Sequence, residues 1–346
     1  MRMLLLGLLL VAGLLAATPA RAVAVCTAIA DPTLPFGNVN SNAPGATTGT
    51  LNITVNCTTS ALSLLATTGV RVCVGIGAGS GGGSSASWRT MKTGTSDSMN
   101  FQLYNTSNFS QVTGLTPRGT PPAQELTLTY NVPLTGGNGT QATQLFAQIP
   151  ANQILASGAY SSTFSGASVV LTWAWNEVLL GTATVPATCN GGATGTNSAS
   201  ASAAFSFTAT ANVLPQCGSY VTTNMNFGNV TGGIPANIDQ TATLTLTCLK
   251  NTAYQISLNN GQNNPAATST RRMATTLGTG TYYLTYELYR DSARSLRWGN
   301  TLNVDTVGGT GSGSAQQLTI YGRVPPVTGQ PPAGAYNDLV QVTITY

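Results

Sequence analysis

Few side chains in this sequence are suited to catalysis. The sequence has no histidine, so it lacks the usual general base and the commonest metal ligand. Glu287 and Asp291 are the nearest pair of carboxylates, but they lie among the arginines of residues 290–297, which favours ion pairing at a surface. We therefore expect no enzymatic activity, no cofactor and no metal site.

The first 22 residues predict a secretory signal peptide. Arg2 supplies the positive charge, residues 4–17 form an apolar run too short to span a bilayer, and small residues stand at positions 20 and 22. The alternative is a lipoprotein anchored through Cys26, but Val25 stands where that signal needs a small residue. We expect a mature chain that starts near Val23, is exported through the periplasm and has no transmembrane helix.

The six cysteines are the remaining reactive side chains, and in an exported chain they predict disulfides. Cys26 is followed ten residues later by a Phe-Gly-Asn-Val motif that ends at Val39, and Cys57 comes eighteen residues after Val39. The same motif and spacings recur from Cys217 to Cys248. This repeat predicts two copies of one domain. The expected disulfides are Cys26–Cys57, the equivalent Cys217–Cys248 and, by elimination, Cys73–Cys189.

Later parts of the two copies also match. Residues 126–133 match residues 318–325, and a Gly-Ala-Tyr motif that ends at Tyr160 matches one that ends at Tyr336. On this alignment, the stretch between Pro133 and Tyr160 is sixteen residues longer than its counterpart in the second copy. The first copy is therefore expected to carry additional loops.

Both copies contain short alternating strands between loops rich in Gly, Asn, Pro and Ser, with almost no helical periodicity. Strands that recur at such short intervals predict an all-β fold of two immunoglobulin-like β-sandwich domains. The stretch 190–202 has the Gly, Ser, Ala and Thr content that is typical of a linker. The predicted organisation is a signal peptide at 1–22, an N-terminal domain at 23–189, the linker at 190–202 and a C-terminal domain at 203–346.

The composition of the chain is unusual for a soluble protein. Charged residues make up only 6% of it, and Thr, Ser, Asn and Gly take their place. Without Arg2 and Arg21 of the signal peptide, 11 of the 13 basic residues and all 9 acidic residues remain, which leaves a net charge of +2. This charge predicts no nucleic-acid partner. Such Thr-rich chains suit extracellular fibres and shells.

The motifs resemble those of the spore coat U domain family. In the second copy the cysteine pair and the Phe-Gly-Asn-Val motif are followed by Arg271-Arg-Met, Tyr286-Glu-Leu-Tyr, Gly-Ala-Tyr-Asn-Asp338 and a terminal Val-Thr-Ile-Thr-Tyr346. The first copy matches less closely, because Trp-Arg89-Thr-Met stands where Arg-Arg-Met is expected. The family includes the pilins of archaic chaperone–usher pili, and two such domains behind one signal peptide look like a tip adhesin.

The resemblance implies that the C-terminal domain lacks its last strand and is completed by donor-strand complementation. The implied partners are a periplasmic chaperone, the outer-membrane usher and an adjacent pilin. The pattern of residues is compatible, because a sandwich that ends at Tyr346 leaves an unpaired edge that a partner strand would cover. Only Val23, Ala24 and Val25 precede Cys26, fewer than the roughly ten residues of a donor strand. We therefore expect this chain to accept a strand, give none and end a fibre.

Residues 203–213 have the pattern of a donor strand, because apolar and polar side chains alternate along them. Three interpretations stay open: the segment completes the first domain in cis, a hairpin at 178–185 already closes that domain, or the segment is the first strand of the second domain. The inward face of the candidate donor strand would consist of Phe205, Phe207, Ala209, Ala211 and Val213.

Apolar residues that the first copy adds in its loops are candidates for binding a surface. Tip adhesins of the family are understood to use hydrophobic loops, which implies attachment to abiotic or host surfaces and biofilm formation. The competing interpretation is that these residues are core. The candidates are Leu62, Leu64, Leu65, Phe146, Ile149, Ile154, Leu155, Trp175, Val178, Leu179 and Leu180.

The sequence therefore predicts an adhesin at the tip of a pilus on the cell surface. One alternative is a structural coat protein or minor pilin without an adhesive role. Another is a carbohydrate-binding adhesin that stacks sugars on Trp88 or Trp175.

Overall fold

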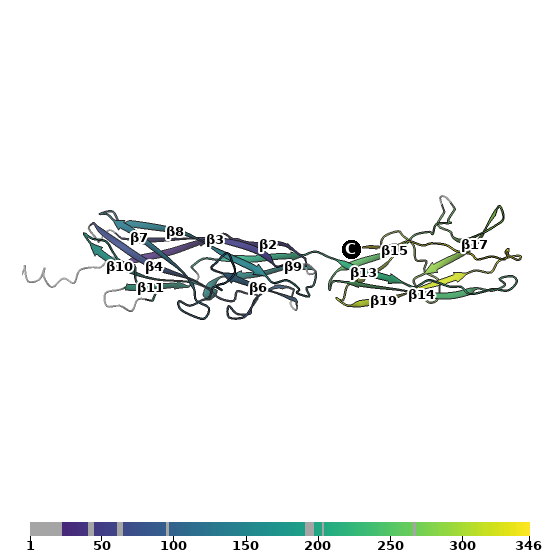
Figure 1. The fold of residues 1–346 in the computed structure, drawn as a ribbon, viewed down its shortest axis with the longest axis horizontal. Coiled ribbons are helices and arrows are strands. Elements are labelled where there is room, and N and C mark those ends of the chain that lie inside the picture. Colours follow the sequence, from purple (N-terminus) through teal and green to yellow (C-terminus); the bar gives the residue numbers. More distant parts are fainter. Residues whose placement is uncertain are drawn as a thin grey trace, which may run out of the picture. The chain divides into compact units, whose positions relative to one another are not determined.

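The computed structural model describes residues 23–40, 45–60, 65–94, 97–190, 197–202, 204–265 and 268–346, and the predicted signal peptide lies outside these residues. The described chain consists of β-strands and the loops between them, with almost no helix, and divides into two compact units (Figure 1). Unit 1 contains the described residues up to Ile154 and Ala159–Asn212, and unit 2 contains Leu155–Gly158 and Val213–Tyr346. Within the described residues, no helix has the length and apolar character needed to cross a membrane.

Unit 1 has an eight-stranded sheet in the order β1-β3-β8-β6-β5-β9-β12-β2 and a four-stranded sheet in the order β11-β10-β4-β7. Alternation builds its core, since the inward Leu51, Ile53 and Val55 of β3 are fully buried. The larger sheet comprises β1 (Ala24–Ala30), β2 (Thr33–Val39), β3 (Thr47–Thr59), β5 (Arg89–Thr93), β6 (Asp97–Tyr104), β8 (Gly137–Ile149), β9 (Gly158–Phe164) and β12 (Phe207–Val213). The smaller sheet comprises β4 (Ala66–Ile76), β7 (Gln124–Val132), β10 (Val169–Leu179) and β11 (Asn197–Ser202).

Unit 2 has a five-stranded sheet in the order β13-β14-β19-β17-β16 and a three-stranded sheet in the order β18-β15-β20. Leu244, Leu246 and Ile256 are fully buried between the sheets, beside the indole of Trp298. The strands are β13 (Cys217–Thr222), β14 (Ile238–Cys248), β15 (Ala253–Leu258), β16 (Arg271–Leu277), β17 (Gly280–Tyr289), β18 (Val307–Thr310), β19 (Ala315–Val324) and β20 (Val342–Thr345).

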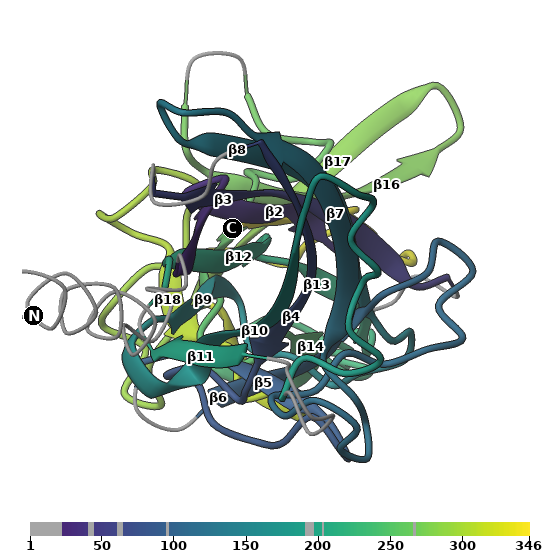
Figure 2. The same ribbon diagram turned by 90° about the vertical axis from the view of Figure 1, so that its left-hand side faces the viewer.

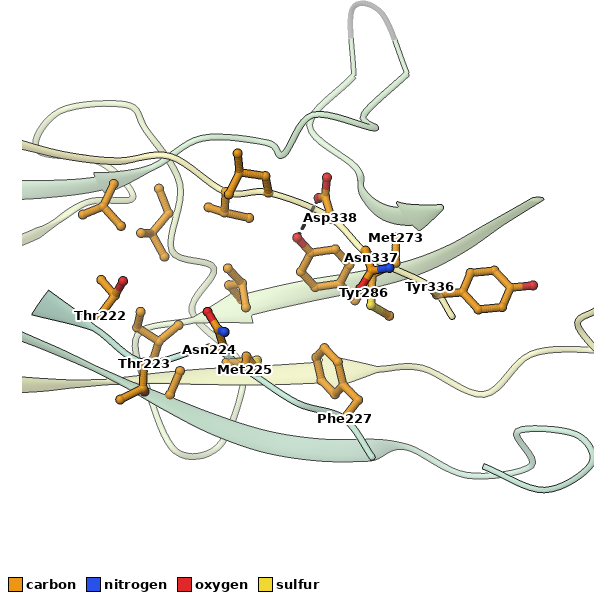
Figure 3. A pocket seen from close by; sticks show the side chains of 17 residues that line it. Thr222, Thr223, Asn224, Met225, Phe227, Met273, Tyr286, Tyr336, Asn337 and Asp338 are labelled. Atoms are coloured by element: carbon orange, nitrogen blue, oxygen red, sulfur yellow. Dashed lines mark hydrogen bonds between the residues drawn. The ribbon is translucent and has the colours of Figure 1, made fainter. Parts of the chain in front are cut away.

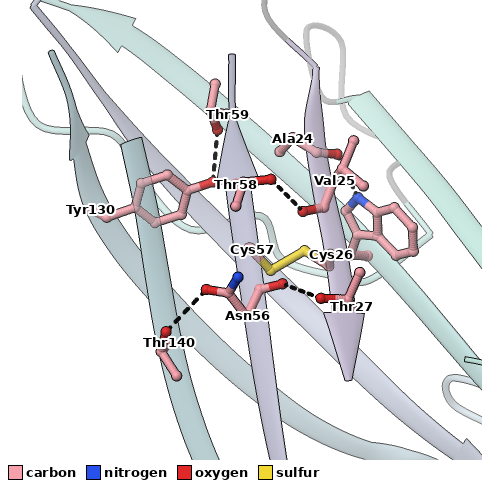
Figure 4. The surroundings of a disulfide bond; sticks show 11 residues. Ala24, Val25, Cys26, Thr27, Asn56, Cys57, Thr58, Thr59, Tyr130 and Thr140 are labelled. Atoms are coloured by element: carbon pink, nitrogen blue, oxygen red, sulfur yellow. Dashed lines mark hydrogen bonds between the residues drawn. A yellow bond between two sulfur atoms is a disulfide. The ribbon is translucent and has the colours of Figure 1, made fainter. Parts of the chain in front are cut away.

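The three predicted disulfides are present in the structure. Cys26 lies directly opposite Cys57 in the β1–β3 pair (Figure 4), and the Cα atoms are 4.0 Å apart. Cys217 and Cys248 occupy the same place in the β13–β14 pair, at 3.9 Å. This common geometry agrees with the predicted repeat.

The chain that follows β10 excludes one of the alternatives left open by the sequence and corrects one prediction. Residues 180–190 form no hairpin strand; they run back along β4, where Leu180 N donates to Leu65 O (3.2 Å) and Arg71 Nε donates to Pro186 O (2.6 Å). Asn197–Ser202 is strand β11, paired with β10, and so is not linker. The linker prediction was wrong because small polar residues suit an outer strand as well as a linker.

Strand β12 belongs to unit 1 and lies between β9 and β2 (Figure 2). Its inward side chains are buried, and the ring of Phe207 stacks on that of Phe164 with centroids 4.5 Å apart. Three interpretations of residues 203–213 were left open by the sequence. The structure agrees with the first of them, in which β12 completes unit 1 in cis. The boundary between the units therefore falls at residues 212–213, at the end of β12.

The predicted match between residues 126–133 and 318–325 is wrong. Strand β19 pairs with β14, and in unit 1 the strand that pairs with the equivalent β3 is β8. Residues 318–325 therefore correspond to the end of β8, not to β7. Both β7 and β8 alternate apolar and polar residues, so only the pairing distinguishes them.

An arginine is fully buried at the same place in each unit. Arg89 Nη2 donates to the carbonyl oxygens of Ile76 (2.6 Å) and Thr113 (2.8 Å), and its Nη1 contacts Gln102. Arg271 makes equivalent bonds, but its Nη1 contacts the carboxylate of Glu287. Burial lowers the pKa of Arg89 to about 9, so this guanidinium remains charged at neutral pH although no described carboxylate pairs with it.

Candidate functional site

A groove in unit 2 occupies the place that β12 fills in unit 1. The counterpart of β2 is the segment 224–230, which contains the second Phe-Gly-Asn-Val motif. The counterpart of β9 is the segment 334–340, because Asn337 bridges Ala274 of β16 as Ser161 of β9 bridges Lys92 of β5. Neither segment is a strand, and both line hollows of about 410 and 600 Å³.

The groove is lined mainly by apolar and aromatic side chains (Figure 3). Phe227 on one wall approaches the ring of Tyr286 edge-on, with centroids 6.0 Å apart. Met225, Met273 and Val340 are half-buried around them. A strand laid here would cover apolar surface from both sheets of unit 2.

The exposed fractions of equivalent residues in the two units show which side chains β12 buries in unit 1. Val39 ends the first Phe-Gly-Asn-Val motif and is 6% exposed, whereas Val230 ends the second and is 47% exposed. Phe36 is buried, whereas the equivalent Phe227 is half-buried. The same motif is therefore core in unit 1 and groove wall in unit 2.

One wall of the groove also presents backbone groups. Asn337 exchanges two backbone hydrogen bonds with Ala274 (2.8 and 2.9 Å), and Leu339 O accepts one from Gln262 N (3.1 Å). Because successive residues of an extended chain point their backbone groups to opposite sides, those of Asp338 and Val340 face the groove. Among the described residues, these groups have no backbone hydrogen-bond partner. The wall is therefore an edge that can pair with an added strand.

A tyrosine–carboxylate pair lies in this groove. Tyr286 Oη donates to Asp338 Oδ2 at 2.7 Å (Figure 3). Burial, and then the bond and charge of Asp338, raise the pKa of Tyr286 far above the usual tyrosine value. Tyr286 therefore keeps its proton and remains a hydrogen-bond donor at alkaline pH.

The free energy of unfolding of unit 2 is expected to fall as pH rises above about 10. An unfolded tyrosine ionises near that pH, whereas folded Tyr286 holds its proton, so the unfolded state binds fewer protons and gains stability. Urea unfolding at about pH 8 and about pH 11 would measure the loss. The loss should be smaller in Tyr286→Phe; an unchanged loss would assign the effect to other groups.

Three chain segments of unit 1 meet at one end of its smaller sheet, which we call the apolar pole. Ala66, at the start of β4, lies opposite Leu179 at the end of β10 and opposite Val132 at the end of β7. The residues just beyond these strand ends are therefore neighbours. The exposed apolar residues at the pole are Leu65 (64%), Leu134 (62%) and Leu180 (78%), together with Val178 and Leu179.

Four of the predicted surface-binding residues, Leu65, Val178, Leu179 and Leu180, lie at the apolar pole and are exposed. Leu62 and Leu64 fall outside the described residues. Leu134 was not predicted from the sequence, although a leucine between Pro133 and two nearby glycines has the signature of an exposed turn.

Three predicted binding residues are instead core: Ile149, Leu155 and Trp175 are buried. Ile149 ends β8, whose alternate side chains point inward, and Trp175 lies within β10. Phe146 is half-buried on the other face of β8. Ile154 is 96% exposed but follows the far end of β8, away from the apolar pole. The buried indole of Trp175 is also not available to stack a sugar.

The chain has weak structural similarity to tip subunits of known structure. The crystal structure of the CsuC–CsuE chaperone–tip adhesion subunit pre-assembly complex from archaic Csu pili of Acinetobacter baumannii aligns with 93% of this chain and 100% of that chain, at 20% identity and a TM-score of 0.42. The CupB6 tip adhesin of Pseudomonas aeruginosa aligns with 93% of this chain and 95% of its own, at 12% identity and a TM-score of 0.33.

Sequence similarity is more informative. Protein U of Myxococcus xanthus is 35% identical over 133 residues, which are 35% of this chain and 71% of that protein. The model of the Spore Coat Protein U domain matches residues 11–166 and 203–343, most of the chain, as two copies. The second match begins at 203, so it includes β12, which the structure places in unit 1. This chain therefore belongs to the Spore Coat Protein U domain family.

Proposed function

We propose that this protein is the adhesive tip subunit of a chaperone–usher pilus. Unit 2 takes up a strand from an adjacent pilin, and unit 1 binds a surface through its apolar pole. The observation that carries the proposal is the asymmetry between the two copies: β12 covers the core of unit 1, whereas the equivalent position of unit 2 is a groove with an edge that can pair.

The origin of β12 supports a pilin as the partner. This strand directly precedes unit 2 in the chain, so one domain is completed by the segment that comes before the next domain. In the same way, the segment that precedes the domain of an adjacent pilin chain would fill the groove of unit 2. The five inward side chains of such a strand would contribute on the order of 10 kcal/mol gross by burial. A periplasmic chaperone would cover the groove before the usher exports the subunit.

The apolar pole supports the adhesive role. Its exposed leucines come from three segments, and clustered exposed apolar residues usually mark an interaction site. The surrounding sequence contains polar Thr, Ser, Asn and Gln residues. Attachment by burial of these leucines requires little chemical selectivity, which suits abiotic or host surfaces and biofilm formation.

Immunogold electron microscopy with an antibody against unit 1 tests this function. Gold at fibre ends, one cluster per fibre, is the expected result. Gold along the shafts would instead indicate a minor pilin. Gold spread over a surface without fibres would indicate a coat component.

A further inference from the structure

The groove of unit 2 differs in charge from the equivalent site of unit 1 at one inward position. Ser80 N donates to Thr163 O (2.8 Å) in unit 1, and Gln262 N donates to Leu339 O (3.1 Å) in unit 2. These equivalent bonds align Asp338 with Ser162. The position that holds a neutral hydroxyl beneath β12 in unit 1 therefore holds a carboxylate in the groove of unit 2.

Two contacts establish which residue of β12 lies over Ser162. On the outward face, the hydroxyls of Thr163 and Thr208 are 3.2 Å apart. On the inward face, the rings of Phe164 and Phe207 stack. Both contacts fit one antiparallel register, which places Ala209 directly opposite Ser162. A strand in the same register in unit 2 would place its equivalent residue opposite Asp338.

The two oxygens of the Asp338 carboxylate share its hydrogen bonds unequally. Its Oδ1 accepts hydrogen bonds from Gln262 N (2.9 Å), Asn263 N (3.2 Å) and Asn263 Nδ2 (3.1 Å). Among the described residues, Oδ2 accepts one hydrogen bond, from Tyr286 Oη, although a carboxylate oxygen has about two lone-pair sites. An alanine laid over Asp338 would remove water from this site without replacing its hydrogen bond, which is costly for a charged group.

We propose that Asp338 selects an incoming strand with serine or threonine at the position that Ala209 holds in β12. Opposed residues of an antiparallel pair have Cβ atoms about 5 Å apart, within reach of a bond from a short hydroxyl side chain to a carboxylate. The inference rests on the proposed uptake of a strand by unit 2. It also implies that segments like β12, with alanine there, fill this groove poorly, which keeps copies of this chain from joining one another.

Two fluorescent eleven-residue peptides test the selection on the full mature chain. One has the sequence of residues 203–213, and the other carries Ala209→Ser. Wild-type protein is expected to bind the serine peptide about tenfold more tightly, because a hydrogen bond to a charged group is gained. Micromolar peptide should not displace β12 from unit 1, because β12 is tethered at an effective concentration of about millimolar or more.

Asp338→Ser copies the residue of unit 1 and is expected to reduce the preference to about twofold or less. Asp338→Asn, which keeps the shape of the side chain, serves the same purpose if the serine variant does not fold by circular dichroism. If wild type binds the two peptides with equal affinity, or if both variants keep the preference for serine, Asp338 does not select the strand. Either result would leave the proposed uptake of a strand intact. If neither peptide binds wild type or the folded variant, uptake of a strand fails as well, and the proposed function with it.

Discussion

Replacing Leu65, Leu134 and Leu180 together with asparagine is expected to lower surface attachment at least tenfold. The three side chains are exposed at the apolar pole, and burial of each against a surface contributes about 2 kcal/mol. Asparagine removes that term and leaves the backbone unchanged. The measurement is the number of cells retained on a hydrophobic plastic and on glass, at equal numbers of fibres per cell.

Ile154→Asn is the matched control for attachment. This side chain is also apolar and 96% exposed, but it follows the end of β8 that is remote from the apolar pole. It should leave attachment unchanged. An equal loss of attachment in the control would mean that attachment depends on general surface hydrophobicity. Full attachment by the triple variant would mean that the apolar pole is not the binding surface. Loss of secretion by the triple variant would show that its leucines are needed for folding.

Phe207→Ala is expected to lower the free energy of unfolding of unit 1 by about 3–5 kcal/mol. Phe207 is buried and stacks on Phe164, so truncation leaves a cavity beneath β12. Chemical denaturation followed by tryptophan fluorescence measures the change. In a Trp298→Phe background the remaining tryptophans, at 88, 173 and 175, all belong to unit 1.

Thr208→Ala is the control for this strand, because the Thr208 side chain points outward and, among the described residues, its hydroxyl pairs with that of Thr163. Its effect should stay below about 1 kcal/mol. Similar losses for the two variants would mean that β12 is held by its backbone and not by its inward side chains. No loss for Phe207→Ala would mean that β12 does not complete the core of unit 1.

Much of the organisation was determined by the sequence alone. The spacing of Cys26, Phe36 and Cys57 recurs in the second copy, and this identified the repeat and two disulfides. The short alternating strands identified the all-β fold. The alternation of residues 203–213 marked β12 as a strand with one apolar face. These features are local or depend on matched spacing, so they can be seen without knowing which strands are neighbours.

The tertiary structure decided everything that depends on long-range pairing. Strands β7 and β8 have similar alternation, and only the pairing of β8 with β3 showed that Ile149 is core. The strand pairing also determined the position of β12 and brought Leu134 next to Leu65 and Leu180 at one pole. It likewise showed that Asp338 stands where unit 1 has Ser162. An apolar residue has the same local pattern whether a second sheet covers it or not, so its burial follows only from the packed fold.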